Sequence, residues 1–88
     1  MSTINLNDQK MTACVEVIKQ LSKNGEIKIN LLKTLYYLND NRLDLPTTDS
    51  TPEHKFIYSV ALRLMKSTNI EETKRDLINN WKNLLNIE

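Results

Sequence analysis

The stretch that constrains the fold most is TPEHKFIYSVALRLMK, residues 51–66. It carries the signals that begin a helix. Thr51 can cap the helix, Pro52 fits its first turn, and Glu53 places an anion near the positive end of the helix dipole. At 100° per residue, apolar side chains cover an arc of roughly 240°. They are Phe56, Ile57, Tyr58, Val60, Ala61, Leu62, Leu64 and Met65. A helix with so wide an apolar arc must be central to the fold.

The polar side of the same helix is one narrow strip that carries three cations, Lys55, Arg63 and Lys66. This charged strip could lie along an acidic protein surface or along phosphates, or it could be the solvated back of a buried helix. The whole chain has 12 Lys and Arg against 11 Asp and Glu, a net charge of +1. Because the net charge is near zero and no aromatic residues interleave the strip, the sequence argues against nucleic-acid binding.

Composition favours one small helical domain over residues 1–88. The chain has one Gly and two Pro, too little turn chemistry for a fold rich in strands. Its first ten residues lack the features of a signal peptide, and no apolar run approaches the roughly 18 residues that span a membrane. The single cysteine cannot form an internal disulfide. We therefore expect a cytoplasmic domain that does not enter a membrane.

Helix start and stop signals divide the chain into four helices. Asn7 or Asp8 can cap the first helix, and Gly25 can end it. Thr68 with Glu71, or Asn69 with Glu72, has the spacing of a capping box before the fourth. The expected fold class is all-α, a small four-helix bundle that dimerisation could complete. Its expected parts are an arm over 1–6, helices over about 8–23, 27–39, 52–66 and 70–86, and a loop over 40–51.

The start of the second helix is open to more than one interpretation. The expected helix over 27–39 begins with the alternating, β-branched residues Ile27 and Ile29. This segment could instead be a short extended turn, with Asn30 as the cap of a shorter helix. It could also be a strand, but the sequence shows no partner for one.

The apolar faces of the four expected helices differ in width. The first and fourth have stripes of ordinary width, whereas apolar side chains cover roughly 200° of the second. In a monomeric antiparallel bundle each helix needs only about a third to a half of its circumference apolar. The excess on the second and third helices predicts a further buried surface, either a homodimer or a groove for a partner's helix. Alternatively, the arm, the loop and the tyrosine rings cover it. The candidate interface residues are Tyr36, Tyr37, Tyr58, Leu62 and Met65.

Two aromatic residues receive different interpretations, although both are of types enriched at interface hot spots. Trp81 lies within the apolar stripe of the fourth helix, so we expect it in the core. Tyr37 lies off the main stripe of the second helix and is the better interface candidate. Its replacement by Ala is expected to weaken assembly without unfolding the domain.

The residues that commonly carry catalysis are nearly absent. The chain has one His and one Cys, and a zinc site needs about four ligands at characteristic spacings. Cys14 falls on an apolar stripe and is expected in the core, and His54 is expected to be a solvated residue of a first helical turn. Glu71 and Glu72 also lie in a first turn, where capping explains them better than acid-base work. One glycine excludes the glycine-rich phosphate loops. We expect no enzyme activity, no cofactor and no metal.

A helix-turn-helix is a further interpretation, because a short turn at Gly25 joins the first two helices. The second helix, however, presents Leu and Tyr rather than the Arg, Asn or Gln side chains that read base edges. DNA binding through this turn would show a steep dependence on salt concentration.

Two segments, VIKQLSKNGEIKINLLKTLYYLND (17–40) and HKFIYSVALRLM (54–65), resemble the small enterobacterial connector proteins of two-component signalling, the biofilm and acid-resistance regulator family. The resemblance lies in a helix, a turn at 22–25, a Leu-rich helix and a third apolar helix. It covers about half of the chain and does not include the long loop or the fourth helix. It implies a small helical protein that can dimerise and that acts by binding regulatory proteins.

The expected function is therefore stoichiometric binding by a regulator or adaptor, with another protein or a second copy of the chain as partner. An immunity protein, an antitoxin or a phage-encoded inhibitor that blocks one target fits the same features. A DNA-binding regulator is the third interpretation.

Overall fold

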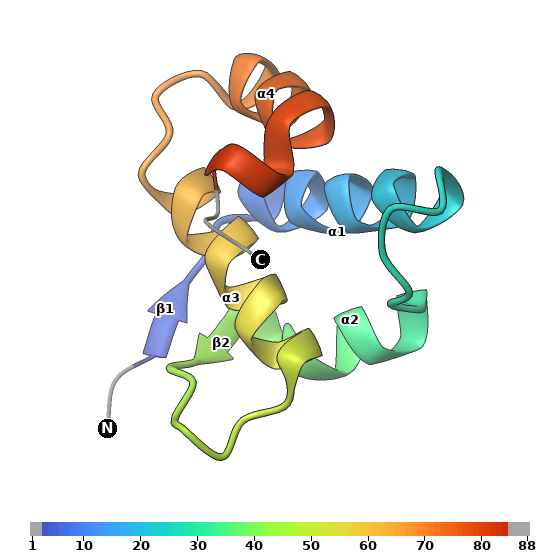
Figure 1. Cartoon of the computed structure of the whole chain (residues 1–88). Coiled ribbons are helices and arrows are strands. Elements are labelled where there is room, and N and C mark those ends of the chain that lie inside the picture. Colours follow the sequence, from blue (N-terminus) through green and yellow to red (C-terminus); the bar gives the residue numbers. More distant parts are fainter. Residues whose placement is uncertain (1–2, 85–88) are drawn as a thin grey trace.

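The computed structural model describes residues 3–84 (Figure 1). The fold is mostly helical, as the sequence predicts. It is not strictly all-α, because the arm and the loop each contribute one strand to a two-stranded antiparallel sheet. In chain order the elements are β1 (Thr3–Asn5), α1 (Asp8–Lys23), α2 (Leu31–Tyr37), the 3-10 turn η1 (Asn39–Asn41), β2 (Arg42–Asp44), α3 (Pro52–Met65) and α4 (Ile70–Leu84).

The small sheet forms because each strand carries one apolar residue between two polar ones. Ile4 lies opposite Leu43 in the ladder. Leu43 is buried and Ile4 is half-buried against the core. Just after β1, the backbone N–H of Leu6 donates to the carbonyl of Asn41 at 2.8 Å, and the Leu6 side chain is buried. The arm and the loop, expected to be irregular, are thus pinned to each other and to the core.

The first helix has the bounds that the sequence predicts. The Oδ1 atom of Asn7 accepts a hydrogen bond from the backbone N–H of Lys10 at 2.8 Å, which satisfies one of the free donors of the first turn. Gly25 follows the helix with a φ of +80°, in the left-handed region. Its N–H donates to the Ser22 carbonyl, and the next N–H, of Glu26, donates to Leu21. These bonds satisfy carbonyls at the end of α1.

The second helix is shorter than the expected 27–39, so that expectation is wrong and the alternative with a cap at Asn30 is confirmed. The Asn30 Oδ1 atom accepts a 2.8 Å hydrogen bond from the N–H of Lys33, so α2 begins directly after it. Ile27 and Ile29 lie in the irregular connection before α2, and Ile29 is buried. Burial of alternate residues explains why this segment shows strand-like alternation without being a strand.

The end of α2 is fixed by its backbone. Asp40 and Asn41 have φ values of 55° and 59°, in the left-handed region that Asp and Asn adopt more readily than most residues. A helix cannot continue through two such residues. The chain therefore turns at η1 and enters β2.

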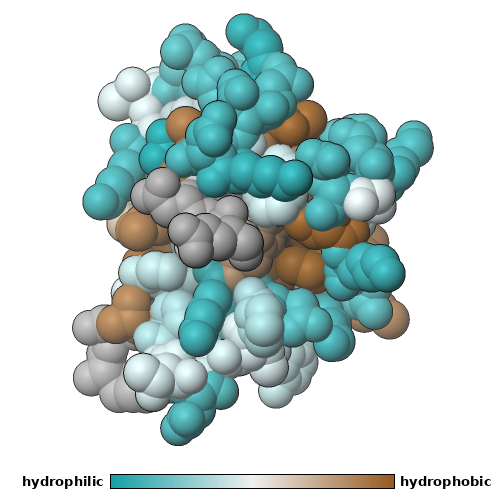
Figure 2. Space-filling view, viewed as in Figure 1, coloured by the Kyte–Doolittle hydropathy of each residue, from teal (hydrophilic) through white to brown (hydrophobic). Residues whose placement is uncertain are grey.

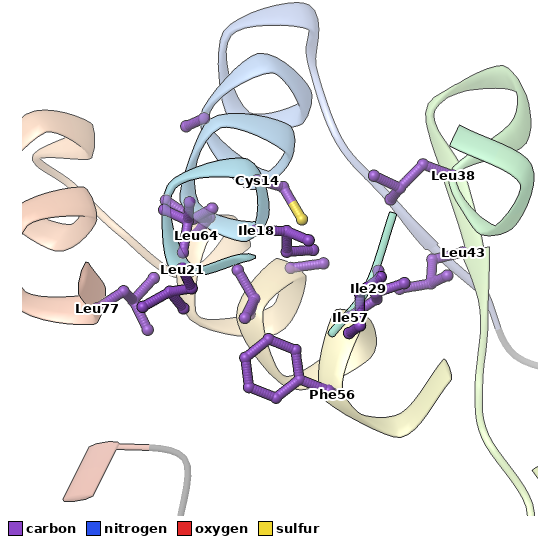
Figure 3. Packing of buried hydrophobic residues seen from close by; sticks show 14 of the residues in the cluster. Cys14, Ile18, Leu21, Ile29, Leu38, Leu43, Phe56, Ile57, Leu64 and Leu77 are labelled. Carbon is purple, nitrogen blue, oxygen red and sulfur yellow. The ribbon is translucent and has the colours of Figure 1, made fainter. Parts of the chain in front are cut away.

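The third helix is the centre of the core, as its apolar arc predicts. It contacts α1, α2 and α4, and it begins where the Thr51 Oγ1 atom accepts from the N–H of His54 at 3.1 Å. Figure 3 shows Ile18 and Leu21 of α1 directed toward α3, with Leu77 of α4 on one side and Leu38 and Leu43 on the other. Burial of each of these side chains contributes roughly 1.5–3 kcal/mol. The buried residues of α3 are Phe56, Ile57, Val60, Ala61 and Leu64.

The fourth helix packs on α1 and α3. The Oδ1 atom of Asn69 accepts from the N–H of Glu72 at 3.1 Å, one of the two caps that the sequence allows. Leu77 and Trp81 are the buried residues of α4, in agreement with the expected core position of Trp81. The expected end of this helix at residue 86 lies outside the described residues.

Candidate protein-binding surface

The second helix turns its large apolar side chains outward. Of its seven residues only Thr34 is buried. The exposed fractions of the other apolar residues are 45% for Leu31, 79% for Leu32, 42% for Leu35 and 78% for Tyr36. We call these four residues the α2 face. An amphipathic helix that buries its polar residue and exposes its leucines is the reverse of an ordinary surface helix.

Two buried positions mark the side of α2 that faces the core. The Thr34 hydroxyl donates to the carbonyl of Asn30 at 3.1 Å, so this buried polar group is satisfied within the helix. Leu38, at the end of α2, is fully buried. Thr34 and Leu38 both face the core. The leucines of the α2 face therefore lie on the sides of the helix that do not face the core.

The α2 face continues onto α1. A surface groove of about 320 Å³ runs between the two helices, and Leu31 and Leu35 form its α2 side. Its α1 side is formed by Met11, Thr12, Val15, Glu16 and Lys19. The exposed apolar surface is therefore larger than one helix, and it carries one acidic and one basic residue at its α1 edge. Apolar patches of this kind mark interaction sites.

Tyr37, the sequence's preferred interface candidate, lies on the other side of α2 and joins it to α3. Its ring stacks on the ring of His54, with centroids 4.9 Å apart and planes 12° apart. Its hydroxyl lies 2.9 Å from the Thr51 Oγ1 atom. The Nε2 atom of His54 lies 2.8 Å from the carbonyl oxygen of Asp44. The His54 side chain is half-buried, so it is not simply solvated as the sequence predicts. Tyr36 is far more exposed, and its ring meets the ring of Tyr37 edge to face with centroids 5.4 Å apart.

The three interface candidates of α3 are all half-buried. Tyr58 and Met65 pack against the core, and Leu62 is covered to a similar degree. The chain itself thus covers most of the wide apolar arc of α3. The excess apolar surface that the sequence predicts for two helices is exposed on α2.

The charged strip of α3 is divided between two places. Lys55 borders an apolar groove near the beginning of the helix. Arg63 and Lys66, both exposed, border a polar hollow at the turn into α4, and the Nη1 atom of Arg63 lies 3.4 Å from the carbonyl oxygen of Leu84. The three cations therefore border two different hollows.

The apolar groove beside Lys55 is a second surface feature, which the sequence did not predict. It has a volume of about 480 Å³. We call it the Trp81 groove. Figure 2 shows hydrophobic residues between hydrophilic ones on the face of the molecule that it draws. The groove is lined by Ile27, Lys28, Ile29, Pro52, Glu53, Lys55, Phe56, Ser59 and Trp81.

Residues from three separate segments build this groove, which explains why no local pattern reveals it. The rings of Phe56 and Trp81 meet edge to face, with centroids 5.5 Å apart. At the border, Lys33 forms an ion pair with Glu53 at 3.3 Å. A hydrogen bond to its own backbone N–H, together with Lys33, holds the pKa of Glu53 below its usual value.

The residues considered for catalysis lie apart. Cys14 is fully buried in α1, as expected, and burial raises the pKa of its thiol to about 12, so that the thiol stays protonated at neutral pH. Glu71 and Glu72 are exposed in the first turn of α4. The Oε2 atom of Glu71 lies 3.6 Å from the Nζ atom of Lys74. Over residues 3–84, no three His, Cys, Asp or Glu side chains gather as metal ligands would. No helix in the same range is long and apolar enough to cross a membrane.

Comparison of the chain with protein families, with curated proteins and with solved structures found no match.

Proposed function

We propose that the protein is a small regulatory or adaptor module that binds another protein through the α2 face and performs no catalysis of its own. The observation that carries this proposal is the exposure of Leu31, Leu32, Leu35 and Tyr36 together on one short helix. Covering an exposed leucine side chain contributes roughly 1.5–3 kcal/mol. Because association itself costs about 4–15 kcal/mol, a specific partner has to cover the whole α2 face and also make contacts around it.

The form of the α2 face supports a protein partner rather than DNA. The helix has seven residues, about 10 Å of length, and its outermost side chains are Leu32 and Tyr36. Base edges are read by hydrogen-bonding side chains, which this face lacks. An apolar face with a tyrosine is typical of protein interfaces.

The resemblance to connector proteins supports the same proposal, because that family also acts by binding regulatory proteins. In the resembling segments, residues 31–36 fall within the Leu-rich helix. The partner can also be a second copy of the chain, in which case two α2 faces cover each other around a two-fold axis.

The proposal is tested by comparing the full chain with two charge-introducing variants. Leu32→Asp places a carboxylate in the α2 face. Leu45→Asp is the matched control, because Leu45 is also exposed, at 47%, but lies in the loop after β2. Each protein is examined by light scattering at micromolar concentration and as bait in an extract of its native host.

The expected result is a dimer or a captured protein that Leu32→Asp loses at least tenfold and Leu45→Asp retains. Equal behaviour of the two variants would overturn the role of the α2 face. A monomer that retains nothing from the extract would contradict the binding function itself.

A further inference from the structure

The Trp81 groove is an apolar recess that the proposed function does not use. Its floor is formed by Ile29, Phe56 and Trp81, each of which exposes 7% of its surface. A volume of about 480 Å³ lies within the range of small-molecule sites, roughly 300–1,000 Å³. The floor is thus apolar and largely covered, and the space above it is small.

The volume limits what can enter. An α-helix with its side chains is about 10 Å wide, so two turns of helix already need more space than the groove has. A single unbranched chain needs less. The α2 face, by contrast, stands outward and is suited to a broad partner surface, so the two features differ in the kind of ligand they accept.

The floor offers no polar partner to a ligand. Its one hydrogen-bond donor, the indole Nε1–H of Trp81, already donates to the Oε2 atom of Glu26 at 2.9 Å. The remaining floor atoms of Ile29 and Phe56 are carbon. A hydrocarbon chain therefore fits the floor, whereas a polar body would lose hydrogen bonds to water that the floor cannot replace.

The rim adds a preference for negative charge. Lys28 and Lys55 line the groove and are exposed, and neither forms an ion pair with any of residues 3–84. The carboxylate of Glu53 is engaged by Lys33, and that of Glu26 by the indole. The acidic groups near the groove are thus already occupied, and two cations face the solvent at its edge.

We propose that the Trp81 groove binds a small-molecule carboxylate with an unbranched apolar chain. The chain lies against Ile29, Phe56 and Trp81, and the carboxylate lies at the rim that carries Lys28 and Lys55. Charge complementarity and the small volume above an apolar floor together define this class of ligand.

The test uses the intrinsic fluorescence of Trp81, the only tryptophan of the chain. The full-length protein is titrated with octanoate, octan-1-ol and octylammonium, which share one chain length and differ in charge. We expect octanoate to change the emission with a dissociation constant below about 1 mM. We expect the alcohol and the ammonium ion to bind at least about fivefold more weakly.

Substitutions of the two rim lysines test whether these lysines cause the preference for an anionic ligand. Lys28→Gln with Lys55→Gln is expected to weaken octanoate binding about fivefold and to leave octan-1-ol binding unchanged. Lys19→Gln with Lys66→Gln is the matched control, since both lysines are exposed and lie outside the groove. Leu32→Asp is also expected to keep octanoate binding, which separates this site from the α2 face.

Two results would overturn the proposal. One is equal affinity for the three ligands, which would mean an apolar recess without selectivity for anions. The other is an unchanged emission up to about 10 mM octanoate, which would mean that the floor is not accessible. Neither result bears on partner binding by the α2 face.

Discussion

The indole nitrogen of Trp81 donates a 2.9 Å hydrogen bond to the carboxylate of Glu26, a residue 55 positions earlier in the chain. This bond ties the end of α4 to the connection between α1 and α2. It also allows the indole to be buried, because a tryptophan N–H without an acceptor would oppose burial.

Glu26→Ala is therefore expected to lower the free energy of unfolding by about 1 kcal/mol, since it removes the acceptor and leaves the donor. Glu26→Gln is the matched control. Its amide oxygen can still accept the bond, and we expect a change within about 0.5 kcal/mol. Urea unfolding followed by the emission of Trp81 measures both. Equal losses in the two variants would show that charge, and not the hydrogen bond, matters at residue 26.

Tyr37 is expected to act mainly in stability, because its ring stacks on His54 and its hydroxyl lies beside Thr51. Tyr37→Phe keeps the ring and should cost about 0.5 kcal/mol, whereas Tyr37→Ala removes the stack and should cost about 2–3 kcal/mol. Thermal unfolding gives the costs, and light scattering gives the assembly state. Full stability of Tyr37→Ala combined with a loss of assembly would instead make Tyr37 the interface residue that the sequence predicts.

Much of the fold could be predicted because it rests on local chemistry. Asn7, Thr51 and Asn69 accept the cap hydrogen bonds that their positions suggest, and Gly25 ends α1 in the left-handed conformation. The wide apolar arc of residues 51–66 correctly placed α3 at the centre.

The rest depends on which segments meet, and a helical wheel does not contain that information. Ile27 and Ile29 fit the start of a helix or an extended turn in the sequence, and they lie in the connection before α2 because Asn30 caps the helix after them. Strands of three residues are too short to show a period. The sequence shows more apolar surface on the second and third helices than a monomeric bundle needs. Only the packing of the chain decides that α3 is covered and α2 is exposed. The Trp81 groove needs three distant segments and has no local signature.

Cys14 gives a prediction about pH. Burial raises the pKa of its thiol from 9.0 to about 12, so the unfolded state releases this proton at a lower pH than the folded state does. The contribution of Cys14 to stability is thus fully present below pH 9.0 and is lost as the pH rises toward 12. Between these values the free energy of unfolding falls by about 1.4 kcal/mol per pH unit.

The measurement compares the wild type with Cys14→Ala in urea at pH 7 and pH 10. The difference in stability between the two proteins should shrink by about 1.4 kcal/mol at the higher pH, because only the wild type carries the thiol. A thiol reagent should likewise modify Cys14 slowly in the folded state and rapidly in urea. A difference in stability that does not depend on pH would contradict the burial of the thiol.

The two leucines Leu32 and Leu38 test the reversed orientation of α2 directly. Leu38 is fully buried, so Leu38→Ala should cost about 2–5 kcal/mol. Leu32 is 79% exposed, so even Leu32→Asp should change the free energy of unfolding by no more than about 0.5 kcal/mol. Urea unfolding at a concentration at which the protein is monomeric separates the two effects. If Leu32→Asp destabilised the monomer as strongly as Leu38→Ala, α2 would face the core with its leucines, and the surface proposed for partner binding would not exist.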